Sequence, residues 1–188
     1  RNLTALKLLN LYKSQVAAQA LDAGAVIVND ISGLHFDPPL GDVISSRNAS
    51  VVLMHMKGVP RTMQRDPHYA DVVSEVKSYL FDAVELAEDK GIAQIIIDPG
   101  IGFGKSLQHN LEIIRRLNEL SAMGYPVLVG PSRKSFIGTI LDLPAEDRLE
   151  GTAAAIALSI MNGANIVRVH DVKQMKRVAQ VVDAVIRS

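Results

Sequence analysis

The sequence predicts an α/β fold in which short parallel strands alternate with helices, and three features of the pattern indicate this. Short runs of apolar, mostly β-branched residues recur along the chain, longer segments between them carry apolar residues at helical spacing, and a glycine precedes several of the runs. The chain has 188 residues, of which 48% are hydrophobic, so it can bury a sizeable core. We therefore expect one domain that covers residues 1–188.

Five runs are expected to be buried strands of a parallel sheet, because their apolar residues are continuous instead of alternating with polar ones. They cover residues 25–28, 50–54, 94–97, 126–129 and 165–169. Helices are expected at residues 15–23, 69–90, 110–123, 147–162 and 172–186, where apolar residues recur at helical spacing. A glycine lies between an expected helix and the next expected strand at four places, each a position where a C-terminal helix cap is expected: Gly24, Gly91, Gly124 and Gly163.

Two architectures fit a repeated strand and helix unit. An open, flavodoxin-like sheet would be complete with five strands. A (β/α)8 barrel of the TIM type typically needs about 250 residues, so a barrel implies that the first two or three β/α units are missing from this chain. The first residue is Arg1 rather than Met, which also favours a missing N-terminal part.

Charge and cysteine content limit the classes of partner. Lys plus Arg and Asp plus Glu number 20 each, so no overall field draws the protein to nucleic acid or to an anionic membrane, and neither is expected as a partner. Any anionic ligand must then be held by local groups. The chain contains no Cys, which fits a reducing compartment, and we expect a cytoplasmic location.

Each apolar run ends at a polar residue or a flexible loop. The polar groups at these ends are Asn29 with Asp30, His55, Asp98, the Ser132-Arg133-Lys134 segment, and Arg168 with His170. One such residue could simply be a helix cap or a turn former. In parallel α/β folds, however, ligands bind at the C-terminal ends of the strands. Because polar groups recur at every strand end, we expect a ring around one pocket, which favours the barrel.

The glycine-rich stretch DPGIGFGKS, residues 98–106, matches neither of two common nucleotide-binding motifs. A P-loop requires Gly five positions before its Gly-Lys-Ser, where this chain has Pro99, and the dinucleotide fingerprint has a different glycine spacing. We expect a mobile loop instead. Its glycines would allow close backbone approach to a ligand, and Phe103 would form an apolar wall.

The five His residues do not predict a metal site, because there is no HExxH motif and no pair has ligand spacing on an expected helix. His55 could be a catalytic residue or a hydrogen-bonded residue of the core. His170 and Arg168 lie two residues apart in an expected strand, so their side chains would share a face and suit an oxyanion such as phosphate. The alternative is a salt bridge to a nearby carboxylate.

Five motifs stand at the strand ends: NDISG from Asn29, LMHMKGVPRTMQ from Leu53, IDPGIGFGK from Ile97, LVGPSRKSFIG from Leu128 and RVHDV from Arg168. Together they resemble the motifs of the dihydropteroate synthases, the folate-pathway enzymes that sulfonamides inhibit. The resemblance implies a TIM barrel and a transferase that joins p-aminobenzoate to 6-hydroxymethyl-7,8-dihydropterin diphosphate and releases pyrophosphate. It also implies Mg²⁺ bound mainly through the substrate diphosphate, with no metal ligand from the protein. A homodimer formed by late helices is expected too, with residues 152–159 as the candidate contact.

The resemblance implies a role for each matching residue. Asn29 and Asp98 would hydrogen-bond the amide and amine edge of the pterin, in a slot lined by Ile31, Met54 and Gly130. A buried carboxylate can accept two such donors and can offset positive charge that develops in the transition state.

The remaining matching residues would contact the pterin ring, the diphosphate leaving group and p-aminobenzoate. Lys134 would reach the pterin ring, Arg168 would cover the pterin face and hold the diphosphate with His170, and Phe103 and Ser132 would border the p-aminobenzoate. No protein nucleophile is evident, so direct transfer is expected. The expected catalytic residues are Asp98, Lys134, Arg168 and His170.

Part of the family's pattern is absent. The Asn motif of its first strand, two loops rich in Ser, Thr, Arg and Pro, and a pterin-binding Asp in a V-D-T-like segment have no counterpart, and residues 6–12 offer only Asn10. Two other functions stay open. A pterin-dependent methyltransferase of the same fold would leave Arg168 and His170 without a purpose. A non-catalytic pterin-binding barrel would bind the pterin diphosphate without releasing pyrophosphate.

Overall fold

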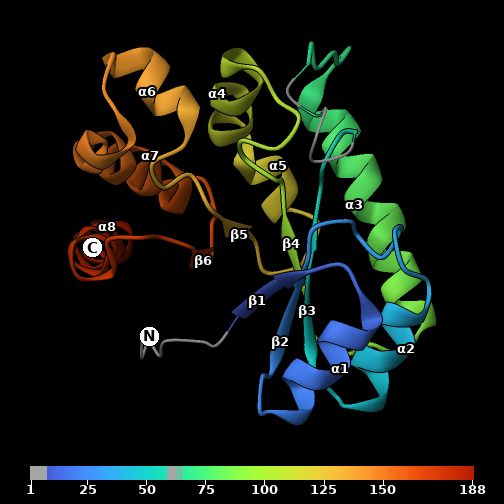
Figure 1. Ribbon diagram of the computed structural model, residues 1–188. Helices are drawn as coiled ribbons and strands as arrows, with labels where there is room; N and C mark the ends of the chain where they lie inside the picture. The colour runs from blue at the N-terminus through green and yellow to red at the C-terminus, as the bar shows by residue number, and fades with distance from the viewer. Residues whose placement is uncertain (1–7, 59–62, 64) are drawn as a thin grey trace. The chain divides into compact units, whose positions relative to one another are not determined.

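The computed structural model, drawn in Figure 1, describes residues 8–58, 63 and 65–188. The chain divides into two compact units. Unit 1 consists of residues 1–56 and 74–99, and unit 2 of residues 57–73 and 100–188. Within each unit the paired strands are parallel, which confirms the predicted α/β class. Residues 59–62 and 64 of the LMHMKGVPRTMQ motif, and residues 6 and 7 of the segment that departs from the family, lie outside the described residues.

Unit 1 is built on a four-stranded sheet with the order β1-β2-β3-β4. The strands are Leu8–Leu11 (β1), Ile27–Asp30 (β2), Ser50–Met54 (β3) and Ile95–Asp98 (β4). The last three overlap predicted runs, because continuous β-branched residues suit a strand covered on both faces. β3 has the predicted bounds, whereas β2 begins two residues later than predicted and includes Asn29 and Asp30, and β4 begins one residue later. β1 was not predicted, since its sequence LLNL lacks β-branched residues, and its pairing with β2 sets its conformation.

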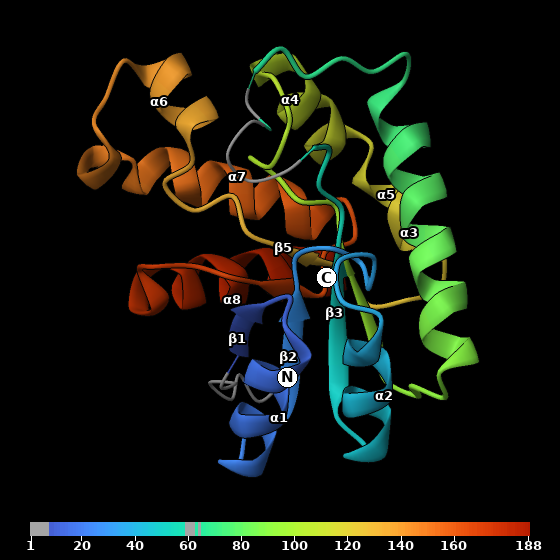
Figure 2. The same ribbon diagram turned by 45° about the vertical axis from the view of Figure 1, so that its right-hand side comes forward.

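Three helices accompany this sheet: α1 (Ser14–Asp22), α2 (Pro39–Ser46) and α3 (Val72–Asp89). All of their residues belong to unit 1 except the first two of α3, which belong to unit 2. α1 and α2 lie side by side in Figure 1 and in Figure 2. The backbone N–H of Ser14 donates to Oδ2 of Asp37 at 2.6 Å, so the loop before α2 satisfies the start of α1. α2 was not predicted, because Pro39 reads as a turn signal although proline also suits the first turn of a helix.

Unit 2 contains a two-stranded parallel sheet formed by β5 (Leu128–Val129) and β6 (Ile166–Val167). α7 and α8 lie side by side in both views (Figure 1, Figure 2). None of the helices in the described part of the chain combines the length and the hydropathy that crossing a membrane requires. The helices of unit 2 are α4 (Leu107–Arg115), α5 (Leu117–Ser121), α6 (Ser135–Leu141), α7 (Leu149–Met161) and α8 (Val172–Arg187), with a 3-10 turn at Ala145–Asp147.

Two predictions for unit 2 were wrong in detail. The single helix expected at 110–123 is interrupted at Arg116, whose guanidinium contacts Glu119 at 2.6 Å and Asp71 at 3.0 Å, contacts that a periodicity cannot reveal. The strand expected at 165–169 ends at Val167, so Arg168 and His170 lie in the loop that follows it. The N–H of Arg168 still donates to a carbonyl of the neighbouring strand at 2.9 Å.

Candidate active site

Three residues expected at the pterin share one face of the unit 1 sheet. Asn29 is in register with Val52, and Met54 is in register with Asp98. Residues in register point to the same face, as do alternate residues of one strand, so Asn29, Met54 and Asp98 lie on one face. All three are buried, with exposed fractions of 0%, 0% and 1%. Ile31 follows β2 in a turn and is half-buried.

Asp30 and His55 lie on the opposite face of this sheet, toward α3. The ring of Tyr79 meets that of His55 edge to face with 4.9 Å between centroids, and its hydroxyl donates to the carbonyl of Ser32 at 2.7 Å. The Asp30 carboxylate accepts hydrogen bonds from the N–H groups of Ser32 and Leu34. Burial raises the pKa of Asp30 above its ordinary value, and burial with the nearby Asp30 charge raises the pKa of Tyr79 to about 12. These contacts favour the core interpretation of His55 and separate both residues from the face expected to bind pterin.

The glycine-rich loop after β4 is held by two buried polar side chains. The ammonium of Lys105, which is 3% exposed, donates to the carbonyls of Gly100 and Phe103 at 3.0 Å each. From α4, Oδ1 of Asn110 accepts a hydrogen bond from the N–H of Gly102 at 2.7 Å. The lysine that closes the motif therefore cross-links the loop internally.

Phe103 and Lys134 meet within unit 2. Nζ of Lys134 lies 4.2 Å from the centroid of the Phe103 ring, a cation–π contact. A Cβ at Gly102 would lie 2.9 Å from Cδ of Lys134, so a glycine leaves room for the lysine stem. The structure thus brings the residue expected beside p-aminobenzoate next to the one expected at the pterin ring.

The start of unit 2 packs against the far end of the same loop. The hydroxyl of Tyr69 donates to the carbonyl of Gly104 at 2.7 Å, and the ammonium of Lys57 lies 4.1 Å from the centroid of the Tyr69 ring. A Cβ at Gly104 would lie 2.4 Å from the carbonyl oxygen of Lys57, so this glycine is required for the close approach. Here the loop approaches its own chain, and its approach to a ligand stays a prediction.

The loops after β5 and β6 also meet. Oγ of Ser132 and Nδ1 of His170 are 2.9 Å apart, and the N–H of His170 donates to the same hydroxyl at 3.2 Å. A Cβ at Gly130 would lie 2.9 Å from Nη2 of Arg168, so the glycine leaves space for the guanidinium. The expected residues of unit 2 therefore form contacting pairs.

Sequence reasoning missed the residues that hold these loops in shape. Arg133 and Asp171 form an ion pair of 2.7 Å between the two loops, and Lys105 and Asn110 hold the glycine-rich loop. For Lys105, Arg133 and Asp171 the signal was their place inside the motifs, next to residues with expected roles, whereas Asn110 lies outside the motifs and gave no signal. A pairing across 38 positions of sequence leaves no local pattern.

Comparison with known proteins places these features in a family. A model of the pterin-binding enzymes, described as "Pterin binding enzyme", matches residues 9–170. A dihydropteroate synthase of Synechocystis sp. is 47% identical over 178 residues, which cover 93% of this chain and 62% of that protein. The chain thus spans less than two thirds of the length of this curated relative.

Solved structures of dihydropteroate synthases are similar to this chain as well. A dihydropteroate synthase from Clostridium difficile, determined in the presence of pteroic acid, has a TM-score of 0.91 and 39% identity over 99% of this chain and 69% of its own. One from Thermus thermophilus, in complex with 4-aminobenzoate, has a TM-score of 0.92 and 38% identity over 96% of this chain and 70% of its own. The chain therefore belongs to the pterin-binding enzyme family, among its dihydropteroate synthases.

Proposed function

We propose that the protein of which this chain is part joins p-aminobenzoate to 6-hydroxymethyl-7,8-dihydropterin diphosphate, forming 7,8-dihydropteroate and pyrophosphate. The observation that carries the proposal is the shared, buried face of Asn29, Met54 and Asp98 at the C-terminal ends of their strands. Relatives solved with pteroic acid and with 4-aminobenzoate support the same substrates. The enzyme is then a transferase of folate biosynthesis, and sulfonamide sensitivity is expected with it.

Asp98 and Asn29 bind the pterin edge in this proposal. The carboxylate accepts two hydrogen bonds from the aminopyrimidine, and the Asn29 amide pairs with the remaining polar edge, while Ile31, Met54 and Gly130 line the slot. Lys134 reaches the pterin ring. Its contact with Phe103, which borders the p-aminobenzoate together with Ser132, supports this assignment.

Bond exchange occurs at the exocyclic methylene of the pterin. The amine nitrogen of p-aminobenzoate forms a C–N bond to this carbon, the C–O bond to the diphosphate breaks, and the electron pair leaves with pyrophosphate while the amine loses a proton to solvent. Arg168 and His170 stabilise the leaving group, and the Asp98 charge offsets positive charge on the pterin. No covalent enzyme intermediate is involved.

Magnesium is proposed to bind mainly through the substrate. In the described part of the chain, no group of three or more His, Cys, Asp or Glu side chains could hold a metal ion. Mg²⁺ is commonly held by substrate phosphate oxygens and water with few protein ligands. No step above depends on an ion held by the protein. A cytoplasmic location stays a prediction.

We further propose that both units belong to one (β/α)8 barrel domain, whose first two or three β/α units are contributed by a longer polypeptide. The chain covers 62% of the Synechocystis relative, and β1 is an edge strand of its sheet in the residues described. The purified protein is then expected to weigh about 7 to 10 kDa more than this sequence, given a barrel of about 250 residues or slightly more. Intact-mass measurement checks this, and a mass that matches the sequence would contradict it.

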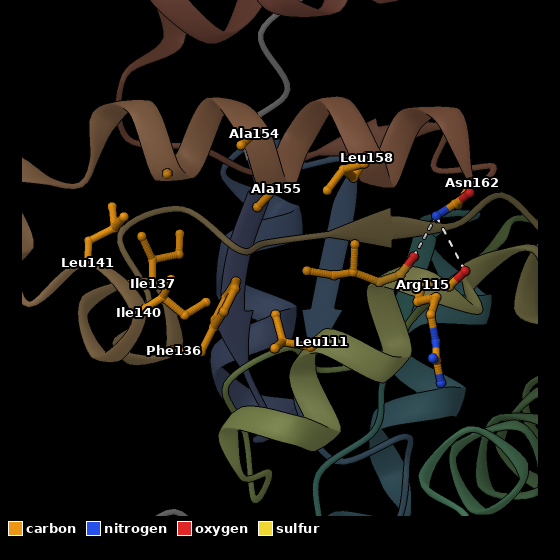
Figure 3. A pocket seen from close by; sticks show the side chains of 12 residues that line it. Leu111, Arg115, Phe136, Ile137, Ile140, Leu141, Ala154, Ala155, Leu158 and Asn162 are labelled. Carbon is orange, nitrogen blue, oxygen red and sulfur yellow. Dashed lines mark hydrogen bonds between the residues drawn. The ribbon is translucent and has the colours of Figure 1, made fainter.

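A homodimer is proposed through unit 2. An apolar groove of about 390 Å³ lies between α4, α6 and α7, and Figure 3 shows Leu111, Ile137 and Leu158 among the side chains that line it. Within the expected contact segment, Thr152 and Ser159 are buried by their own chain, whereas Leu158 is 56% exposed. The contact with a second copy therefore uses the exposed residues of the segment rather than its whole small-residue face.

The proposed activity is tested with the full-length protein, both substrates and Mg²⁺. Dihydropteroate and pyrophosphate should form in equal amounts. Transfer of a methyl group from a methylated pterin to a corrinoid protein would select the methyltransferase instead. Binding of the pterin diphosphate without release of pyrophosphate would select the non-catalytic protein.

A further inference from the structure

The backbone of Arg133 has an unusual conformation. Its φ is 58°, in the left-handed region that non-glycine residues rarely adopt. It stands between Ser132 and Lys134, which both have proposed roles at the substrates. A strained residue of this kind persists only where its surroundings hold it, and such residues cluster at functional sites.

Two residues of the neighbouring segments hold the backbone of this turn. Oγ1 of Thr152, in α7, accepts a hydrogen bond from the N–H of Arg133 at 3.0 Å. Nη1 of Arg148 donates to the carbonyls of Arg133 at 2.9 Å and of Lys134 at 3.3 Å. Thr152 is fully buried, so water does not compete for this hydrogen bond.

The Arg133 side chain ties the turn to the loop after β6. Its Nε and Nη2 donate to Oδ2 and Oδ1 of Asp171 at 3.0 and 2.7 Å, a bidentate pair. The pKa of the Asp171 carboxyl is held below its ordinary value by these hydrogen bonds, so the pair is charged at neutral pH. Asp171 directly follows His170, whose ring contacts Ser132. Two consecutive residues of one loop are therefore fastened to two consecutive residues of the other.

We propose that Arg133 and Asp171 are positioning residues of the synthase reaction: their ion pair fixes the relative placement of Lys134 and His170, through which they act. The inference rests on the proposed function, because it assigns the pair to residues that handle the pterin ring and the diphosphate.

Folding stability and reaction rate should respond differently to loss of this ion pair, which distinguishes a positioning role from a purely structural one. Partly exposed ion pairs contribute little to folding stability, and the side chains of this pair are 33% and 17% exposed. A small displacement of catalytic groups, by contrast, can slow a reaction by as much as about 100-fold. Loss of the pair should therefore affect turnover far more than melting temperature.

The experiment compares Asp171→Asn, Arg133→Met and the double variant in the full-length enzyme. The matched control is Glu119→Gln, which breaks another bidentate pair of unit 2, formed with Arg116 at 2.6 and 3.1 Å; Glu119 belongs to α5 and to neither loop. Each single variant at the loops is expected to lower kcat about 10- to 100-fold, while the KM for p-aminobenzoate changes by less than about threefold. The double variant should be no slower than the worse single variant, because both remove the same interaction. Melting temperatures should shift no more than in the control.

A second readout does not need activity. The ring nitrogens of His170, assigned by comparison with His170→Gln in ¹⁵N-histidine spectra, should shift in Asp171→Asn and in Arg133→Met but not in Glu119→Gln. Unchanged spectra, unchanged kcat, or losses that multiply in the double variant would overturn the inference. A wild-type enzyme without synthase activity would instead contradict the proposed function, and the His170 spectra would still decide whether the pair positions this ring.

Discussion

Asp98→Ala is expected to weaken binding of the dihydropterin by about 2 to 5 kcal/mol, or about 30-fold to several thousand-fold in Kd. The carboxylate is 1% exposed and lies at the end of β4 on the same face as Asn29 and Met54. Removing it leaves the donors of the pterin edge unpaired in a buried place, where water cannot replace the lost partner. Isothermal titration of the full-length protein with the unphosphorylated dihydropterin measures the loss.

Two further variants make the Asp98 experiment specific. Asp98→Asn keeps the volume and removes the charge, so it should lose most of the affinity without opening a cavity. Met54→Leu, at the position in register with Asp98, changes shape at nearly constant volume and should cost less than about 1.5 kcal/mol. An affinity for dihydropterin that stays the same in Asp98→Ala would show that this carboxylate does not anchor the ring.

The elements predicted from the sequence are those in which local pattern and tertiary environment agree. β3 occupies the predicted residues 50–54, because SVVLM is continuous, apolar and largely β-branched. β1 has no such pattern, and its leucines favour a helix as much as a strand, so only its pairing with β2 reveals it. α6 was missed for a similar reason, since its seven residues are too few for a helical period to stand out.

The predicted ring of polar residues at the strand ends wrongly included Asp30 and His55, and the sequence could have shown why. Adjacent residues of a strand point to opposite faces, so Asn29 and Asp30 could not both face one pocket, and the same holds for Met54 and His55. Strand periodicity alone therefore separates the two faces. It could not show that Tyr79 and α3 cover the second face, because that contact joins residues 24 positions apart, counted from His55 to Tyr79.

The residues that shape the loops were the least predictable. Lys105 looks like a ligand-binding cation at the end of a glycine-rich motif, yet its ammonium is buried among carbonyls of its own loop. Arg133 likewise resembles a free surface charge in the sequence but is bound to Asp171. A charged residue in a motif can thus serve the ligand or the loop, and only the hydrogen-bond partners distinguish the two.

Arg168→Ala is expected to weaken binding of inorganic pyrophosphate by about 30-fold to several thousand-fold, while binding of the unphosphorylated dihydropterin falls much less. The guanidinium packs against Gly130 at the end of β5, where no side chain separates it from the backbone. It can offer parallel hydrogen bonds to a phosphate group, and an alanine offers none. His170→Ala should have a smaller effect, because an imidazole offers fewer hydrogen-bond donors to a phosphate group than a guanidinium does.

The control for this prediction is Arg115→Ala, which removes the same charge from an arginine of α4 whose side chain is 74% exposed. General loss of positive charge would weaken pyrophosphate binding in both variants, and raising the salt concentration would then erase the difference between them. A specific site loses affinity only in Arg168→Ala. Arg168→Ala could instead lower the affinities for pyrophosphate and for unphosphorylated dihydropterin by the same factor. The arginine would then maintain the shape of the loop after β6 rather than hold the leaving group, because a misplaced loop lowers the affinity for both ligands, whereas loss of a phosphate-binding group lowers only that for pyrophosphate.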